Sequence, residues 1–387
     1  MNTGDVLDGS LKRIGMQLND MRDNKLDILT NTGLPNLRAV NYGLDDDSGE
    51  HEELITRDKA KPRGVMLHID NPRTKTVDPF TLNNWSETQL AQHLKISKNY
   101  FDLLKAEQPD LLAYNINDRM KHMPKDRLFR TMNGTVRAFL SNSYKTMDID
   151  EVFMAIWPII EDLGLTVRSA KLTERHFYLK CVHTKLTGEI GVGQAMCAGF
   201  MLKTSDVGGG SFTLAEWIEE LICTNGWVAE KVTEEKHLGR KSRVGSIENS
   251  REYFTDKTRM MEDKTFVSQC KDTVSAMFNP VRFEKTLDRF RKAKGIEISA
   301  PLKESVEVVS DKFRFNESES NGILEHLSRG GDPTKFGLAA AITRTAEDLK
   351  DYDRSTEFEG LGTRVVDMSS SEWSRIETAA IIKAKMN

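Results

Sequence analysis

The chain lacks the features that mark secreted, membrane-spanning and disulfide-linked proteins. Its 387 residues include only four cysteines, and no two of them form a CxxC pair. These are Cys181, Cys197, Cys223 and Cys270. No apolar run approaches the length of a membrane span, and the first residues hold no stretch typical of a signal peptide. The absences predict a cytoplasmic protein with reduced, mostly buried thiols and no membrane partner.

Motifs of common enzyme classes are also missing. No GxxxxGK[ST] segment occurs, which excludes a P-loop ATPase. The segment "GVGQAMCAG" (191–199) lacks the strand–turn–helix frame of a dinucleotide site. Cys181 and His183 could begin a zinc site, but the spacing of four ligands is absent. We therefore predict no catalytic residue, no cofactor and no metal, and an enzyme of unknown type is the least favoured class.

Positive charge is scarce overall but gathers in the middle of the chain. The net charge is −4, and residues 1–120, 121–300 and 301–387 carry −4, +4 and −4 respectively. A basic middle between acidic ends is compatible with a core that binds polyanions. It is less basic than a typical dedicated DNA-binding domain, so charge alone decides nothing.

The segment "FRTMNGTVRAFLSNSYKTMD" (129–148) is a basic strip at the middle of the sequence. It holds three cations and three aromatic residues, and its first carboxylate is Asp148. If "TVRAFLS" is a strand, Arg137 and Phe139 share the face opposite Val136 and Leu140. Proteins that bind single strands combine cationic grooves with aromatic platforms, although an ordinary solvated face shows the same pattern.

The following residues predict a helix, three antiparallel strands and a second helix. The helices span 148–164 and 213–227, and the strands span 165–172, 175–183 and 195–206. On the second strand Tyr178 and Lys180 share a face that we expect to track a sugar–phosphate backbone. The loop "HLGRKSRVG" (237–245) adds cations between glycines. The candidate nucleic-acid ligands are Arg130, Arg137, Tyr144, Lys145, Arg168, Tyr178, Lys180, Lys203, Arg240, Lys241 and Arg243.

Four segments follow from these patterns, and together they predict an α+β fold. A central antiparallel sheet of three to five strands is flanked by helices, with helical additions at both ends. Residues 1–63 are expected to be acidic and loosely structured, and residues 64–128 to form a helical subdomain. Residues 129–230 form the α+β core, and residues 231–387 a helical C-terminal region.

Residues 86–104 show the residue pattern of a helix-turn-helix. Ser86 is a candidate N-cap, and Ser97 marks a break between two short helices. DNA-reading versions of this motif often hold glycine in the turn, where this chain has Lys95. A structural helix pair is the preferred interpretation, and recognition of duplex DNA is the alternative.

Four stretches resemble the phage and plasmid family of unknown function numbered nine-three-two. They are "TQLAQHLKISKNYFDLL" (88–104), "FRTMNGTVRAFLSNSYKTMDIDEV" (129–152), "FMLKTSDVGGGSFTLAEWIEELICTNG" (200–226) and "AAAITRTAEDLKDYDRSTEFEGLGTRV" (339–365). The resemblance implies a phage or mobile-element origin and no particular activity. The order of elements is also similar to that of phage single-strand annealing proteins, which bind DNA without ATP.

These observations lead to three functional hypotheses. The first is a phage-type protein that binds single-stranded DNA or RNA and anneals it without ATP during recombination or replication. Rings or filaments of identical subunits would then supply a continuous groove. The second is a structural or host-interacting oligomeric phage protein without nucleic-acid binding. The third is a regulator that binds duplex DNA through residues 86–104.

Overall fold

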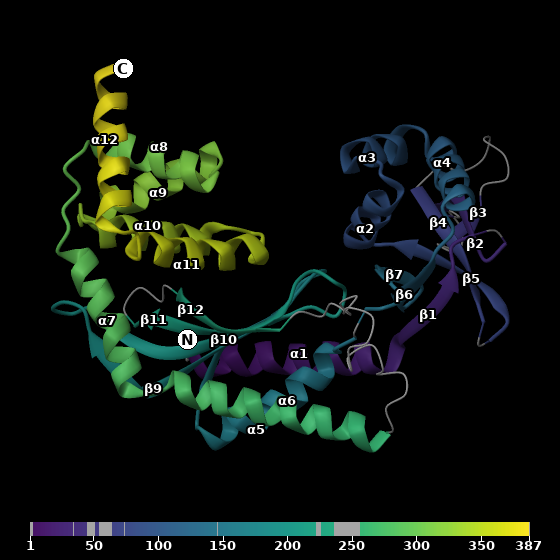
Figure 1. Ribbon diagram of the computed structural model, residues 1–387, viewed down its shortest axis with the longest axis horizontal. Helices are drawn as coiled ribbons and strands as arrows, with labels where there is room; N and C mark the ends of the chain where they lie inside the picture. The colour runs from purple at the N-terminus through teal and green to yellow at the C-terminus, as the bar shows by residue number, and fades with distance from the viewer. Residues whose placement is uncertain are drawn as a thin grey trace, which may run out of the picture.

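The computed structural model describes residues 3–33, 35–44, 51–53, 64–72, 74–144, 146–221, 226–235 and 256–386 (Figure 1). Within these ranges the chain forms a seven-stranded sheet and a five-stranded sheet, with helices packed on both. Helices also form the N-terminal and C-terminal additions. The predicted α+β class is therefore confirmed.

The seven-stranded sheet lies in the N-terminal part of the chain. Its strands are β1 (Lys25–Asn31), β2 (Leu37–Leu44), β3 (His51–Glu53), β4 (Gly64–Asn71), β5 (Thr76–Leu82), β6 (Asp126–Met132) and β7 (Thr135–Ser141). They run in the order β1-β6-β7-β5-β4-β2-β3, and only β5 and β7 are parallel neighbours. The sheet therefore joins strands from both sides of the helical segment that separates β5 from β6.

Three helices between β5 and β6 cover this sheet. They are α2 (Asn84–Leu94), α3 (Lys98–Glu107) and α4 (Pro109–His122). Leu90, Leu94, Phe101 and Leu104 recur at helical spacing and are at most 4% exposed. They pack with Leu67 and other strand residues in one apolar core. The core fixes the helices on the sheet, and their other faces remain open to solvent.

The five-stranded sheet forms the middle of the molecule. Its strands are β8 (Thr166–Leu172), β9 (Phe177–Glu189), β10 (Ala195–Thr204), β11 (Phe212–Glu220) and β12 (Gly226–Glu235), each antiparallel to the next. Helices α1 (Thr3–Asn24), α5 (Ile149–Asp162) and α6 (Asp256–Met277) lie along one face of the sheet (Figure 1). Phe177, Leu179, Phe200 and Leu202 point into the core on that side.

The opposite face of the five-stranded sheet is covered by the C-terminal helices. Helices α7 (Pro280–Lys294), α10 (Lys335–Asp348) and α11 (Tyr352–Val366) contact this face. Helices α8 (Leu302–Phe313), α9 (Glu317–Gly330) and α12 (Ser370–Met386) form an outer layer beyond α10 and α11 (Figure 1). Trp227 of β12 stacks on Phe336 of α10 with ring centroids 5.2 Å apart. Helices α10 and α11 lie across the sheet from α1, α5 and α6 in Figure 1. Neither face of the sheet is therefore an open surface.

Several of the predicted segments are wrong. Residues 64–128 were expected to form a helical subdomain, but they also hold β4 and β5, and β6 and β7 of the expected core 129–230 belong to the same seven-stranded sheet. The first 63 residues were expected to be loosely structured, but their described part forms α1, β1, β2 and β3. Residues 213–227 were expected to form a helix, but they hold β11 and the start of β12. All nine residues of β11 are buried because helices cover both faces of the sheet. This tertiary packing outweighs the local preference of the segment for helix.

Candidate nucleic-acid interface

Arg130 lies in the interior of the protein and not on a binding surface. It is 1% exposed, and its guanidinium faces three carboxylates. These belong to Asp27, Asp148 and Asp206. Burial alone would lower the pKa of Arg130, but the carboxylates raise it above its ordinary value. The prediction that Arg130 faces solvent is wrong, because the carboxylate that ends the basic strip folds back onto it.

The rest of the described strip is also engaged within the protein. Arg137 Nη2 donates to both carboxylate oxygens of Asp206, at 2.9 and 3.0 Å. The hydroxyl of Tyr144 donates to the carbonyl oxygen of Ser205 at 3.2 Å, and burial raises the pKa of that hydroxyl to about 12. Phe139 is 5% exposed. The strip thus joins the two sheets, and its predicted exposed face is wrong.

The cations on the five-stranded sheet are neutralised by residues from distant parts of the chain. Arg168 Nε donates to Glu219 at 2.8 Å. Lys180 Nζ donates to both oxygens of Glu359 on α11, at 2.8 and 2.7 Å. Burial alone would lower the pKa of Lys180, but the carboxylate of Glu359 raises it. The predicted solvent-facing track is wrong here because α11 covers it.

Tyr178 was expected to face a sugar–phosphate backbone, but it is completely buried. Its hydroxyl donates to Asp353 of α11 at 2.8 Å, and Lys203 lies over its ring at 5.4 Å from the centroid. Burial and this bond to a carboxylate raise the pKa of Tyr178. Tyr178 and Lys203 therefore contact each other beneath the C-terminal helices. The remaining predicted ligands, Lys145, Arg240, Lys241 and Arg243, lie outside the described residues.

The helix pair α2–α3 has the geometry that its sequence suggests. A three-residue turn, Lys95 to Ser97, joins the helices. Lys95 has φ 57° and ψ 39°, the left-handed conformation that glycine adopts most readily. Ser97 caps α3 by accepting a hydrogen bond from the amide of Tyr100. Lys95 therefore occupies the conformational position of the glycine in this turn, and we call α2, the turn and α3 the helix-turn-helix.

Interactions between the two helices fix their relative position. The carboxylate of Glu87 on α2 contacts Lys98 at 3.5 Å and also binds Lys105, both on α3. Asn83, and not the predicted Ser86, caps α2 by accepting a hydrogen bond from the amide of Ser86. The hydroxyl of Ser86 instead donates to the carbonyl oxygen of Val136 on β7 at 2.8 Å. The pair is thus anchored to the sheet by α2.

The outward side of α3 is open to solvent. Asn99 is exposed, and Tyr100 and Leu103 are 47% and 48% exposed. Asp102 is exposed as well and binds Lys98 of the same helix. The start of α3 therefore offers an amide and a phenol beside Lys98, a cation that contacts the carboxylates of Glu87 and Asp102.

Several cations near the helix-turn-helix have no carboxylate partner. Lys95 and Lys125 are exposed, and neither side chain makes an ion pair within the described part of the chain. Arg127 is half-buried, and its Nη2 donates to Nδ1 of His93 at 2.9 Å. Burial, Arg127 and Lys125 lower the pKa of His93 to about 4, so its ring is neutral near pH 7. We call His93, Lys95, Lys125 and Arg127 the basic cluster.

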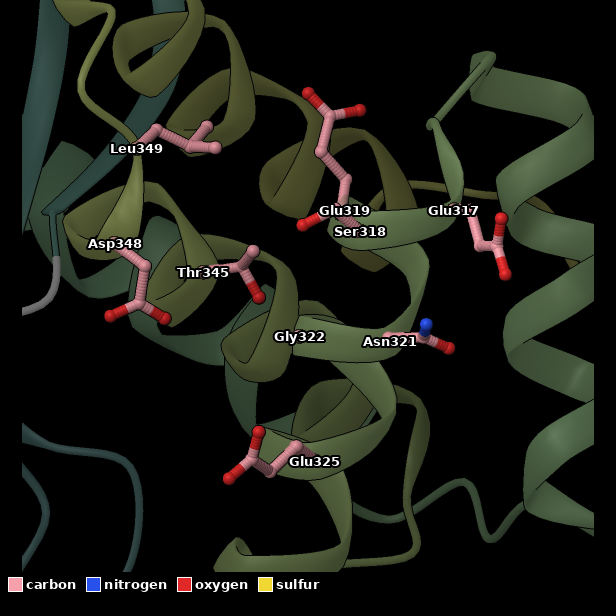
Figure 2. Close-up of a pocket in the computed structure, with 9 residues that line it drawn as sticks. All are labelled: Glu317, Ser318, Glu319, Asn321, Gly322, Glu325, Thr345, Asp348 and Leu349. Atoms are coloured by element: carbon pink, nitrogen blue, oxygen red, sulfur yellow. The ribbon is translucent and has the colours of Figure 1, made fainter.

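A cavity in the C-terminal helices has the opposite charge. It has a volume of about 560 Å³ and lies between α9 and α10 (Figure 2). Its lining includes Glu317, Glu319, Glu325 and Asp348. Of these, Glu319 is bound by Arg354, whose Nε and Nη2 donate to its two oxygens at 2.9 Å. A pocket rich in carboxylates repels phosphate, so this cavity is no candidate for nucleic acid.

Metal-binding clusters and membrane-spanning helices are both absent from the described residues. Across the described ranges, no three His, Cys, Asp or Glu side chains are arranged to hold a metal ion. None of the helices in those ranges is both long and apolar enough to cross a membrane. Cys181, Cys197 and Cys270 are buried, as predicted, and Cys223 lies outside the described residues.

No family model, curated protein or solved structure matches the chain. The resemblance to the phage and plasmid family therefore stays a prediction.

A local excess of positive charge in the sequence marks the basic cluster, although no aromatic strand pattern accompanies it. "KHMPKDR" (121–127) carries three cations, a histidine and one acid where a strand begins. The side chain of that acid, Asp126, accepts a hydrogen bond from Asn31 at 2.8 Å. Because strand neighbours point to opposite sides, Asp126 leaves Arg127 without a counter-ion. Counting local charge after the helical segment would have identified the cluster.

The left-handed backbone at Lys95 leads to a prediction about stability. Replacing Lys95 by glycine removes the steric cost of a side chain at positive φ, and we expect the free energy of unfolding to stay equal or rise by up to about 1 kcal/mol. Lys95→Val should lower it by about 1–2 kcal/mol, because a β-branched residue fits this conformation poorly. Urea denaturation measures both. A clear loss of stability in Lys95→Gly would mean that the lysine stem packs on the helices.

Proposed function

We propose that the protein binds duplex DNA through the helix-turn-helix, with the start of α3 in the major groove. The left-handed turn at Lys95 carries the proposal, because it gives two capped, cross-linked helices the form of a DNA-reading motif. In such motifs the first residues of the second helix contact base edges. Here these residues include the exposed Asn99, and an asparagine amide can pair with adenine through two hydrogen bonds.

The distribution of unpaired cations supports this location. Arg130, Arg137, Arg168 and Lys180 each bind a carboxylate and hold the fold together. Lys95, Lys125 and Arg127 do not bind a carboxylate within the described ranges, and they lie in or near the helix-turn-helix. Contacts between cations and phosphates position a protein on DNA, and base contacts specify the sequence. The basic cluster and α3 can supply these two kinds of contact.

Single-strand annealing is the first hypothesis from the sequence, and fewer of its predicted ligands are available in the structure. Its strand cations are buried or paired, and neither face of the five-stranded sheet is open to a sugar–phosphate chain. The loop cations Arg240, Lys241 and Arg243 lie outside the described residues, so their contribution stays a prediction. Assembly into rings or filaments stays a prediction too.

The proposal is tested by fluorescence anisotropy with a random duplex pool and with the same strands unpaired. We expect tighter binding to duplex DNA, with an affinity that falls between about 50 and 200 mM salt and a logarithmic slope of about −3. That slope corresponds to roughly three neutralised phosphates. Lys95→Gly should retain the fold and make the slope less steep by about 0.9, since one phosphate contact is lost.

Selection of preferred sequences from the pool tests the role of α3. Asn99→Ala should relax the preference at one base position by about 1–3 kcal/mol while the salt slope stays unchanged. Lys171→Gln is the matched control, because Lys171 is exposed on β8, far along the chain from the helix-turn-helix. Preferential single-strand binding that survives Lys95→Gly and Asn99→Ala would contradict the proposal and favour annealing.

A further inference from the structure

Arg127 is a half-buried cation that no carboxylate in the described part of the chain neutralises. Its guanidinium lies over the ring of Phe139 at 5.5 Å from the centroid, and its Nη2 binds His93. Because the arginine donates, Nδ1 of His93 must accept, so the ring is neutral and adds no negative charge. No carboxylate within the described ranges forms an ion pair with Arg127. Arg130, three positions further along β6, faces three carboxylates.

This arrangement is unusual because buried charges are normally paired. Burial lowers the pKa of Arg127, which shows that its surroundings disfavour the cation. Nε of Arg127 and Nε2 of His93 are both buried and without a hydrogen-bond partner. The histidine and phenylalanine nevertheless hold the guanidinium plane in one orientation. A fixed, unneutralised guanidinium is what an anion site requires.

A second positive charge lies close by. Lys125 is exposed and near enough to His93 to lower its pKa. Asp126, which lies between the two cations in the sequence, binds Asn31 instead. Within the described ranges neither Lys125 nor Arg127 forms an ion pair, so their positive charges are not neutralised by direct contact with a carboxylate. Arginine suits phosphate because its donors match two phosphate oxygens, and lysine adds a point charge.

We propose that Arg127 and Lys125 form a phosphate-binding site in which His93 positions the guanidinium. His93 is a positioning residue, since its ring nitrogen accepts from the arginine and does not reach the anion. Where the proposed function holds, the ligand is a phosphate of the DNA backbone beside the helix-turn-helix. A free phosphate or a nucleotide has the same chemistry, and the experiment distinguishes these sources.

The first measurement is titration of the full chain with inorganic phosphate, followed by phosphorus NMR line broadening. The wild type should bind, and Arg127→Gln and Lys125→Gln should each weaken binding at least tenfold. Lys171→Gln is the control and should bind as the wild type does. Lys125 is exposed, so its variant keeps the test decisive if Arg127→Gln fails to fold. His93→Gln keeps an acceptor for the arginine and should retain binding, whereas His93→Leu should weaken it.

The second measurement is the salt slope of duplex binding by the same variants. A slope less steep by about 0.9 in Lys125→Gln identifies the DNA backbone as the source of the phosphate. Lost phosphate binding with an unchanged slope, or with no DNA binding by the wild type, assigns the site to a free phosphate. In the latter case the proposed function fails while the site stands. Absence of phosphate binding by the wild type, together with unchanged slopes in the variants, overturns the inference.

Discussion

Replacing Arg130 by glutamine should destabilise the protein by about 3–5 kcal/mol at neutral pH. The change removes the cation that Asp27, Asp148 and Asp206 share, and leaves their carboxylates in a site where the arginine is 1% exposed. Lys25 contacts Asp148 at 2.5 Å and offsets only part of the loss. Urea denaturation at neutral pH measures the effect. The matched control is Arg119→Gln, because Arg119 is exposed and without an ion pair in the described structure.

The pH dependence of this destabilisation follows from Asp148. Burial alone would raise its pKa, but Arg130 and Lys25 hold the pKa below its ordinary value. In the wild type this contribution to stability is present above the unfolded pKa of about 4 and is lost as the pH falls through the lower folded pKa. Without Arg130, burial raises the pKa, so the folded variant binds protons more readily. The deficit of Arg130→Gln should therefore shrink as the pH falls from 7 toward 4.

The same variant separates a structural role from a binding role. If Arg130 bound nucleic acid, its substitution would lower the affinity of the protein for DNA and leave the stability of the protein unchanged. Arg130→Gln with wild-type stability and lost DNA binding would contradict the assignment of Arg130 to the junction between the sheets.

The second large effect is expected for the buried pair of Lys180 and Glu359. Lys180→Met leaves the carboxylate of Glu359 buried without its partner, and should cost about 3–5 kcal/mol. Lys180 is 4% exposed and Glu359 8% exposed, so solvent screens the pair little. The double variant Lys180→Met with Glu359→Met should recover most of the loss, because apolar side chains of similar volume can replace a buried ion pair.

The double-variant cycle also tests whether α11 covers the five-stranded sheet. Coupling of several kcal/mol requires that the two side chains touch, although they are 179 positions apart in the sequence. Additive effects of the two substitutions would show that the sheet face is open, as the sequence first suggested. A control pair is Lys303 and Glu307, which are exposed or half-buried on one helix at 3.9 Å and should couple by less than about 0.5 kcal/mol.

The sequence predicts most local structure, but it does not predict which cations are buried and paired with carboxylates. The hairpin of β8 and β9 and the helix pair follow from periodicity and caps, which are local properties. The prediction of a helix in place of β11 was wrong because Leu214, Trp217 and Ile218 have helical spacing. A strand that is buried on both faces shows no alternation of polar and apolar residues. The burial of β11 on both faces follows from tertiary packing, which local sequence does not show.

The predicted nucleic-acid site on the five-stranded sheet was wrong for a related reason. The partners of Tyr178 and Lys180 are Asp353 and Glu359, which lie more than 170 positions away. A count of local charge does not include such acids, so the strand cations looked unopposed. By contrast, the neighbours of Lys95 and Arg127 are close in the sequence or on adjacent elements. In the described part of the chain, neither Lys95 nor Arg127 forms an ion pair with a carboxylate.

Photochemical cross-linking maps the contact between protein and DNA most directly. A bromodeoxyuridine-substituted duplex is irradiated with the full chain, and the linked peptides are identified by mass spectrometry. The account predicts cross-links within residues 95–106 and near residues 119–127. Cross-links confined to residues 129–144 or 166–204, with none at the helix-turn-helix, would contradict it.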